Sequence, residues 1–303
     1  MPLPPFGGDD ARPCVYENAR AVILPVPYEG TVSYGGGASR GPGAILEASA
    51  QLEMYDEELD AAIDEVGLHT LPPVEARPGE APEALMERIH AAALPPLREG
   101  RLLVTLGGEH SISHGVFTAL LAARVGSASP VSLLQIDAHA DLRDTYQGTP
   151  HSHACIMARA HELGLPFVQV GIRSLSAGER DFLRQTGLDA NVFWGKDLHG
   201  PGGNLDPAGW IDQVVERLQG DVYVTIDVDG LDPSIMPATG TPEPGGLDWP
   251  TVLRLLRSVA RAHRVVGFDL TELAPIPGLH GPEFLCARLA YKMIGYALKV
   301  GKS

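Results

Sequence analysis

Short apolar runs alternate along the chain with stretches of helical periodicity. Between these runs, 208–219 and 249–260 carry apolar residues at helical spacing, and the first places Trp210, Val214 and Leu218 on one stripe. We expect seven runs to be buried strands: 21–27, 102–106, 131–136, 167–172, 191–194, 222–226 and 265–270. Strands that are apolar on both faces and alternate with helices indicate an α/β protein with a mostly parallel sheet.

Gly- and Pro-rich segments separate these elements without dividing the chain. The segments 30–44, 199–204 and 238–246 are expected to be loops. No repeat of solenoid period is visible. Because the candidate chemical residues run from about 110 to 272, they need one scaffold, and we expect residues 1–303 to form a single catalytic domain.

Composition and charge narrow the class of protein. Hydrophobic residues make up 44% and charged residues 20%, with no apolar run of membrane-spanning length and no basic, apolar leader at the start. The cysteines are too few and too scattered for a disulfide framework, so we expect a cytoplasmic protein without a membrane partner. The net charge of −15 argues against nucleic acid and favours a small cationic substrate.

The stretch QIDAHAD carries three metal-capable side chains at alternate positions. In an extended chain Asp137, His139 and Asp141 would point the same way and repel unless a cation lay among them. Solvated loop charges would explain one such motif, but TIDVDG repeats the spacing with Asp227 and Asp229 after a second apolar run. An oxygen-rich set with imidazole favours Mn²⁺ over structural Zn²⁺, and the number of carboxylates indicates two ions. Such a pair acidifies a shared water.

Four stretches that follow or end strand-like runs would meet at one edge of the sheet. These stretches are GGEHSISHG (107–115), IDAHADLRD (136–144), TIDVDGLDP (225–233) and GFDLTELAP (267–275). In parallel sheets ligands bind at the carboxyl ends of the strands. Together with the loop PYEGTVSYGGGASRGP, these stretches resemble the motifs of the ureohydrolase family of arginases and agmatinases over most of the chain.

The resemblance implies a three-layer α/β/α sandwich around an eight-stranded, mostly parallel sheet, with two Mn²⁺ per subunit. It assigns one ion to His110, Asp137, Asp141 and Asp227. It assigns the other ion to Asp137, His139, Asp227 and Asp229. Relatives form trimers or hexamers, so a homo-oligomer is expected.

The resemblance also implies substrate-side roles. Glu272 corresponds to the acid that pairs with the guanidinium, His153 to a histidine that shuttles protons, and Thr241 to a substrate-side position. Asp141 would relay a proton to the leaving amine. A structural role is the alternative for His153, which is a surface or core histidine unless it lies at the site.

Other polar residues near these motifs are given structural roles. His114 follows His110 by four residues, a helical metal-pair spacing, but His110 alone fits the family. Glu109 and Asp144 are expected to support the site, and Cys155 to be a packing residue.

The run DLRDTYQGTPHSHACIM resembles agmatinases, so agmatine is the expected substrate, cleaved to putrescine and urea. The chain departs from that group at His151, where tyrosine is common, and at Ala160, where a second arginine is common. A guanidino acid such as 4-guanidinobutyrate, received by Arg143, is the alternative, followed by arginine. Mononuclear zinc deacetylases and binding proteins that have lost activity share the fold and remain as other classes.

Overall fold

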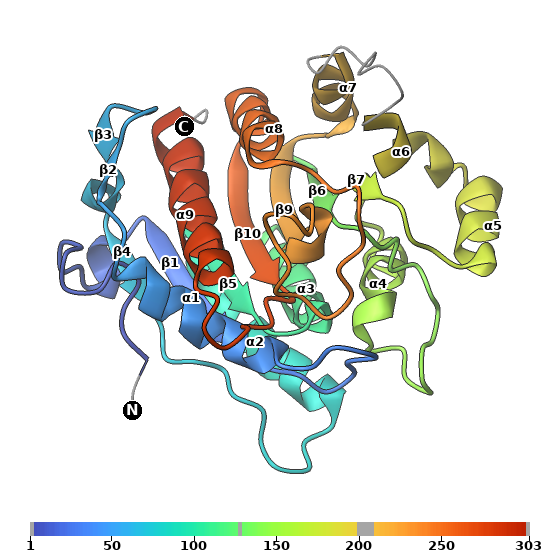
Figure 1. Cartoon of the computed structure of the whole chain (residues 1–303), viewed down its shortest axis with the longest axis horizontal. Helices are drawn as coiled ribbons and strands as arrows, with labels where there is room; N and C mark the ends of the chain where they lie inside the picture. Colours follow the sequence, from blue (N-terminus) through green and yellow to red (C-terminus); the bar gives the residue numbers. More distant parts are fainter. Residues whose placement is uncertain (1–2, 127–128, 199–208, 301–303) are drawn as a thin grey trace.

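The computed structural model describes residues 3–126, 129–198 and 209–300. It contains an eight-stranded sheet, ordered β4-β1-β5-β10-β9-β6-β7-β8, in which all neighbours are parallel (Figure 1). In chain order the strands are β1 (Ala21–Val26), β4 (Leu68–Thr70), β5 (Leu102–Gly107), β6 (Val131–Ile136), β7 (Phe167–Ile172), β8 (Val192–Trp194), β9 (Asp221–Asp227) and β10 (Val265–Thr271). Seven confirm the predicted runs, while the three-residue β4 was missed.

Helices cover both faces of this sheet, which confirms the α/β/α sandwich (Figure 1). One face packs against α1 (Gly41–Ser49), α7 (Gly209–Arg217), α8 (Trp249–Ala262) and α9 (Gly281–Gly295). The other packs against α2 (Pro82–Arg98), α3 (Ser113–Ala123), α4 (Ile156–Glu162) and α5 (Ala177–Thr186). The short α6 (Gly195–Leu198) follows β8, and β2 (Tyr55–Asp56) pairs with β3 (Ala61–Ala62) in a separate antiparallel hairpin.

Successive side chains along each strand point to opposite faces of the sheet and so contribute to the hydrophobic core on each face. In β9, Val222, Val224 and Ile226 pack into the core on the α8 side, whereas Tyr223 packs into the core on the α3 side. The predicted helices correspond to α7 and α8, and the loop expected at 199–204 lies outside the described residues. Among the residues described, no helix is long and apolar enough to cross a bilayer.

The sheet order brings the four chemical motifs together. They follow β5, β6, β9 and β10, and these strands are consecutive neighbours in the order β5-β10-β9-β6. Since all four are parallel, their carboxyl ends lie at the same edge.

Candidate metal centre

His110 begins a short 3₁₀ turn directly after β5, where the backbone passes very close to a neighbouring loop. A Cβ on Gly108 would lie 2.0 Å from the carbonyl oxygen of Tyr28, so only glycine fits this position. The chain can therefore turn sharply after the strand. As a result, the His110 side chain is fully buried among the strand ends.

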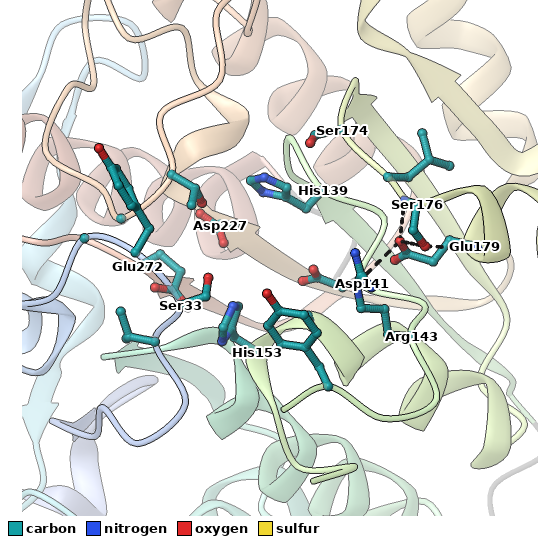
Figure 2. A pocket seen from close by; sticks show the side chains of 18 residues that line it. Ser33, His139, Asp141, Arg143, His153, Ser174, Ser176, Glu179, Asp227 and Glu272 are labelled. Carbon is teal, nitrogen blue, oxygen red and sulfur yellow. Dashed lines mark hydrogen bonds and ion pairs between the residues drawn. The ribbon is translucent and has the colours of Figure 1, made fainter. Parts of the chain in front are cut away.

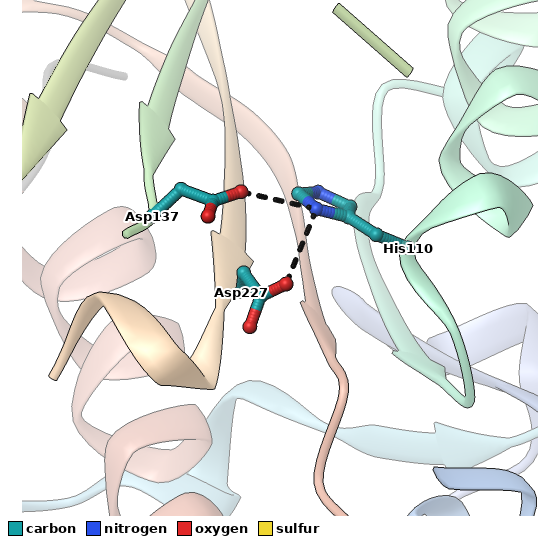
Figure 3. A group of neighbouring side chains, drawn as sticks. All are labelled: His110, Asp137 and Asp227. Carbon is teal, nitrogen blue, oxygen red and sulfur yellow. Dashed lines mark ion pairs between the residues drawn. The ribbon is translucent and has the colours of Figure 1, made fainter. Parts of the chain in front are cut away.

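Three carboxylates converge on one nitrogen of His110. Its Nδ1 atom is buried without a hydrogen-bond partner in the described residues. Carboxylate oxygens lie 3.3 Å away on Asp137 and 3.6 Å away on Asp227 (Figure 3). An oxygen of Asp141 also lies 3.3 Å away. A nitrogen lone pair facing three anions is repulsive unless a cation is shared. One imidazole nitrogen with carboxylate oxygens suits an ion such as Mn²⁺.

A second group of candidate ligands shares Asp137 with the first. His139 Nδ1 lies 3.0 Å from Asp229 Oδ2 and 3.7 Å from Asp137 Oδ1. His110, Asp137 and Asp227 form one possible ion group, and Asp137, His139 and Asp229 form the other. A carboxylate that belongs to both groups is the arrangement that a pair of neighbouring ions requires, so these residues fit two cations.

Close packing and unusual backbone angles hold the acids in place. A Cβ on Gly230 would lie 2.7 Å from the backbone nitrogen of Asp137, so glycine lets the two ligand loops touch. Asp141 adopts a left-handed φ of 52°, and its carbonyl accepts bonds from Met157 and Ala158 at 3.0 and 3.2 Å. Such conformations are uncommon outside glycine and cluster at functional sites.

Glu272 has the same left-handed geometry, with a φ of 66°. Its backbone N–H donates to the Gly108 carbonyl at 2.7 Å, and its Oε1 accepts from the His110 backbone at 2.7 Å. Burial, and then the charge of Glu109, raises the pKa of Glu272 well above its usual range. A buried acid of this kind would gain from a cationic partner.

A row of buried polar residues crosses five adjacent strands beneath the ligands, and sequence reasoning missed it. The row members pair in register and are all fully buried: Thr105, Asp269, Thr225, Gln135 and Gln169. In β6 and β9 the row residue stands two positions before a candidate ligand, on the same face. The signal that could have revealed the row is the presence of polar residues at matching positions of mostly apolar strands.

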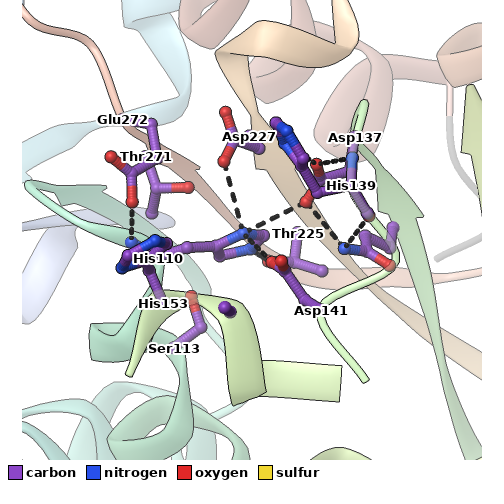
Figure 4. Close-up of polar contacts among 12 residues, drawn as sticks. His110, Ser113, Asp137, His139, Asp141, His153, Thr225, Asp227, Thr271 and Glu272 are labelled. Atoms are coloured by element: carbon purple, nitrogen blue, oxygen red, sulfur yellow. Dashed lines mark hydrogen bonds and ion pairs between the residues drawn. The ribbon is translucent and has the colours of Figure 1, made fainter. Parts of the chain in front are cut away.

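This row orients the first ion group. Thr225 Oγ1 donates to Asp269 at 2.7 Å. The same oxygen lies 2.7 Å from Nε2 of His110, which Figure 4 shows among the other candidate ligands. Because its single proton goes to the carboxylate, the hydroxyl accepts from Nε2–H, which leaves the lone pair of His110 on Nδ1. Asp269 also accepts bonds from Ser113 and Tyr223 at 2.9 and 3.0 Å.

On the other side of the centre, Gln135 Nε2 donates to Asp137 Oδ2 at 2.7 Å. Gln169 in turn donates to the Gln135 side-chain oxygen at 2.5 Å. The carboxylate shared by both groups is therefore held by its own chain of hydrogen bonds.

Crowding shifts the proton affinities of the centre. Burial, followed by the charge of Asp137, raises the pKa of Asp141 to about 7. Burial alone would lower the pKa of His139, but its bonds with Asp137 and Asp229 raise it to about 12. These groups therefore bind protons near neutral pH that a cation would displace.

A pocket of about 280 Å³ opens above the centre (Figure 2). The predicted residues that line it are His139, Asp141, His153, Asp227, Thr241 and Glu272. Thr241 Oγ1 donates to Asp229 at 3.4 Å. Burial, as its largest cause, lowers the pKa of His153. The structure thus brings the predicted catalytic and substrate-side residues to one cavity.

The outer wall of the pocket holds an arginine that is already paired. The Arg143 guanidinium lies over the Tyr146 ring at 4.9 Å, and its Nε is 3.9 Å from Glu179. Tyr34 also lines the pocket and is 85% exposed, which places it at the mouth. A substrate carboxylate would have to compete with Glu179 for Arg143.

Other residues considered from the sequence lie apart from the centre. The His114 ring stacks on His151 at 5.6 Å, and neither histidine belongs to the two ion groups found in the described residues. Asp144 pairs with Arg159 at 3.1 Å. Burial raises the pKa of the Cys155 thiol to about 11, so it is protonated at neutral pH.

Comparison with known proteins places the chain among the hydrolases of the ureohydrolase class. The sequence matches the Arginase family over residues 19–295, and the chain belongs to that family.

Two curated relatives are N(1)-aminopropylagmatine ureohydrolases. One from Thermus thermophilus is 43% identical over 290 residues, covering 96% of this chain and 93% of the relative. The relative from Synechocystis is 40% identical over 286 residues, covering 93% of this chain and 90% of the relative. The solved agmatine ureohydrolase of Thermoplasma volcanium superposes with a TM-score of 0.83 at 30% identity, covering 99% of this chain and 96% of that chain.

Proposed function

We propose that the chain is a binuclear manganese amidinohydrolase that releases urea from agmatine-type cations. The observation that carries this proposal is the pair of ligand groups sharing Asp137 beneath a pocket that also holds the buried acid Glu272. Two bound ions would supply an acidified water and neutralise the carboxylates around them. One catalytic domain is part of the proposal, because the two cores lie on opposite faces of one sheet.

Four residues that line the pocket would have different roles in the proposed reaction. Glu272 would accept hydrogen bonds from the guanidinium, since a buried carboxylate pairs strongly with a planar cation. Asp141, which lines the pocket, would relay a proton to the leaving amine. His153 would exchange protons with solvent, and Thr241 would help to position the substrate.

Within this class, we propose N1-aminopropylagmatine as the preferred substrate and agmatine as the second. The two curated relatives named above favour the longer cation over the agmatine that the sequence alone led us to expect. An acidic protein of net charge −15 would attract the additional ammonium group. The pairing of Arg143 with Glu179 and Tyr146 argues against a guanidino acid.

Urea release from a panel of guanidino compounds tests the proposal. With manganese-loaded protein, we expect kcat/KM to fall about 10-fold from N1-aminopropylagmatine to agmatine and at least about 100-fold further to arginine, or roughly 1.4 and 2.7 kcal/mol. A higher kcat/KM for agmatine than for N1-aminopropylagmatine would reverse the choice between the two cations. A kcat/KM for arginine comparable with that for agmatine would contradict the proposal that the substrate is an agmatine-type cation. Chelation should abolish activity, and Mn²⁺ at two ions per chain should restore it.

Assembly and location are also proposed from the family. A cytoplasmic trimer or hexamer is expected. A monomer in light scattering at micromolar concentration would contradict this assembly.

A further inference from the structure

Thr31, on the loop between β1 and α1, joins His153 to a buried acid. Its Oγ1 lies 2.8 Å from Glu109 Oε1 and 3.1 Å from His153 Nδ1. The His153 backbone N–H donates to the same oxygen at 3.1 Å. One hydroxyl therefore contacts the ring and the backbone of His153 and the carboxylate of Glu109.

Glu109 is completely buried and surrounded by donors. Its oxygens accept from the backbone N–H groups of Gly30 and Thr31, both at 2.6 Å, and from Ser111 Oγ at 2.5 Å. The Thr31 hydroxyl completes this set. A carboxylate with four donors around it acts only as an acceptor, so the Thr31 proton points to Glu109.

The direction of that proton determines the state of the His153 ring. A hydroxyl has one proton and two lone pairs. With its proton donated to Glu109, Thr31 Oγ1 can only accept from His153, once from the backbone N–H and once from the ring. The ring nitrogen that faces Thr31 must therefore be Nδ1–H. Ser152 Oγ lies farther from Nδ1, at 3.5 Å, and already accepts from the Ala154 backbone.

We propose that Thr31, held by Glu109, is a positioning residue that fixes His153 as the Nδ1–H tautomer and leaves Nε2 to exchange the proton. This rests on the proposed role of His153 in urea release. His153 lines the pocket (Figure 2). Within the part of the chain that the structure describes, the ring makes its hydrogen-bond contacts through Nδ1, and Nε2 has no hydrogen-bond partner. The Tyr146 ring packs edge-on against His153, with 6.0 Å between the ring centroids.

Proton balance explains why the tautomer matters. In the Nδ1–H form Nε2 binds a proton, which gives an imidazolium, and then releases it to solvent. In the Nε2–H form the pocket-side nitrogen already carries a proton and cannot accept another. Without the Thr31 hydroxyl, Nδ1–H loses its acceptor and the two tautomers compete.

Two matched substitutions separate the hydroxyl from the shape of the side chain. Thr31→Val keeps the branched shape without the O–H, and Thr31→Ser keeps the O–H. In the manganese-loaded full chain, we expect Thr31→Val to lower kcat by about 10- to 100-fold, part of the range for a general acid–base group. KM and manganese content should be unchanged, Thr31→Ser should retain kcat, and added imidazole should partly restore Thr31→Val.

Imidazole ¹⁵N NMR on protein loaded with diamagnetic Zn²⁺ measures the tautomer of His153 independently of enzyme activity. The His153 signal is assigned by its loss in His153→Asn. We expect protonated Nδ1 in the wild type and Thr31→Ser, and a mixture in Thr31→Val.

The outcomes separate the positioning role from the proposed function. Wild-type kcat and an unchanged tautomer in Thr31→Val, while His153→Asn is impaired, would overturn the positioning role and leave the enzyme assignment intact. A loss that follows reduced manganese content would overturn it too, because Thr31 would then be structural. Absence of urea release by the wild type from every guanidino compound would refute the proposed function, whatever the NMR shows.

Discussion

Replacing Thr225 by valine should weaken one of the two ion sites without removing any ligand. The hydroxyl lies 2.7 Å from His110 Nε2 and 2.7 Å from Asp269, and all three residues are fully buried. Valine has nearly the same shape but cannot accept from Nε2–H. A buried donor without a partner costs about 1–3 kcal/mol. Losing the partner of a metal-bound histidine lowers metal affinity by about 10- to 100-fold, or roughly 1.4–2.7 kcal/mol.

Calorimetric titration of Mn²⁺ into metal-free protein measures this effect. We expect one of two binding events to weaken by that factor in Thr225→Val, with the other unchanged, and activity to return at saturating Mn²⁺. Thr225→Ser, which keeps the hydroxyl, should bind as the wild type does. Both events unchanged in Thr225→Val would refute the orienting role.

A double-mutant cycle then tests whether the row acts as one unit. Asp269→Asn removes the acceptor that directs the Thr225 proton, so its effect on Mn²⁺ affinity should overlap with that of Thr225→Val. The combined change should be smaller than the sum of the two. Additive losses would show that Asp269 acts on the fold independently of His110.

Three further changes probe the centre. Glu272→Gln should lower kcat/KM about 10- to 150-fold, or roughly 1.5–3 kcal/mol, with manganese content intact; a loss explained by missing metal would contradict it. Because the pKa of Asp141 is raised from 3.8 to about 7, its deprotonation should destabilise metal-free protein as pH rises through that range, and thermal melting against pH checks this sign. Gly230→Ala should lower Mn²⁺ affinity through its 2.7 Å clash with Asp137, measured by calorimetry.

The strands and the candidate metal ligands follow from local patterns in the sequence, so the sequence alone was enough to predict most of them. Seven strands were predicted because a strand buried on both faces is a mostly apolar run, as in β6 and β9. The alternation of Asp137, His139 and Asp141 after such a run indicated cation ligands, because their charges would otherwise repel. The short β4 was missed because three residues, Leu68–Thr70, carry too little pattern.

Only the tertiary structure decided which distant residues support those ligands. Gln135, Thr225 and Asp269 are polar residues in the middle of mostly apolar strands, and the sequence gives no evident partner for any of them. Strand register places them side by side beneath the ligands, in pairs fixed by backbone hydrogen bonds of the sheet. Thr31 meets His153 across 122 residues of chain, a contact that depends on how two loops pack rather than on any local pattern. Local periodicity therefore determined the strands and the candidate ligands, whereas the proton positions on His110 and His153 depend on contacts that only the folded chain brings together.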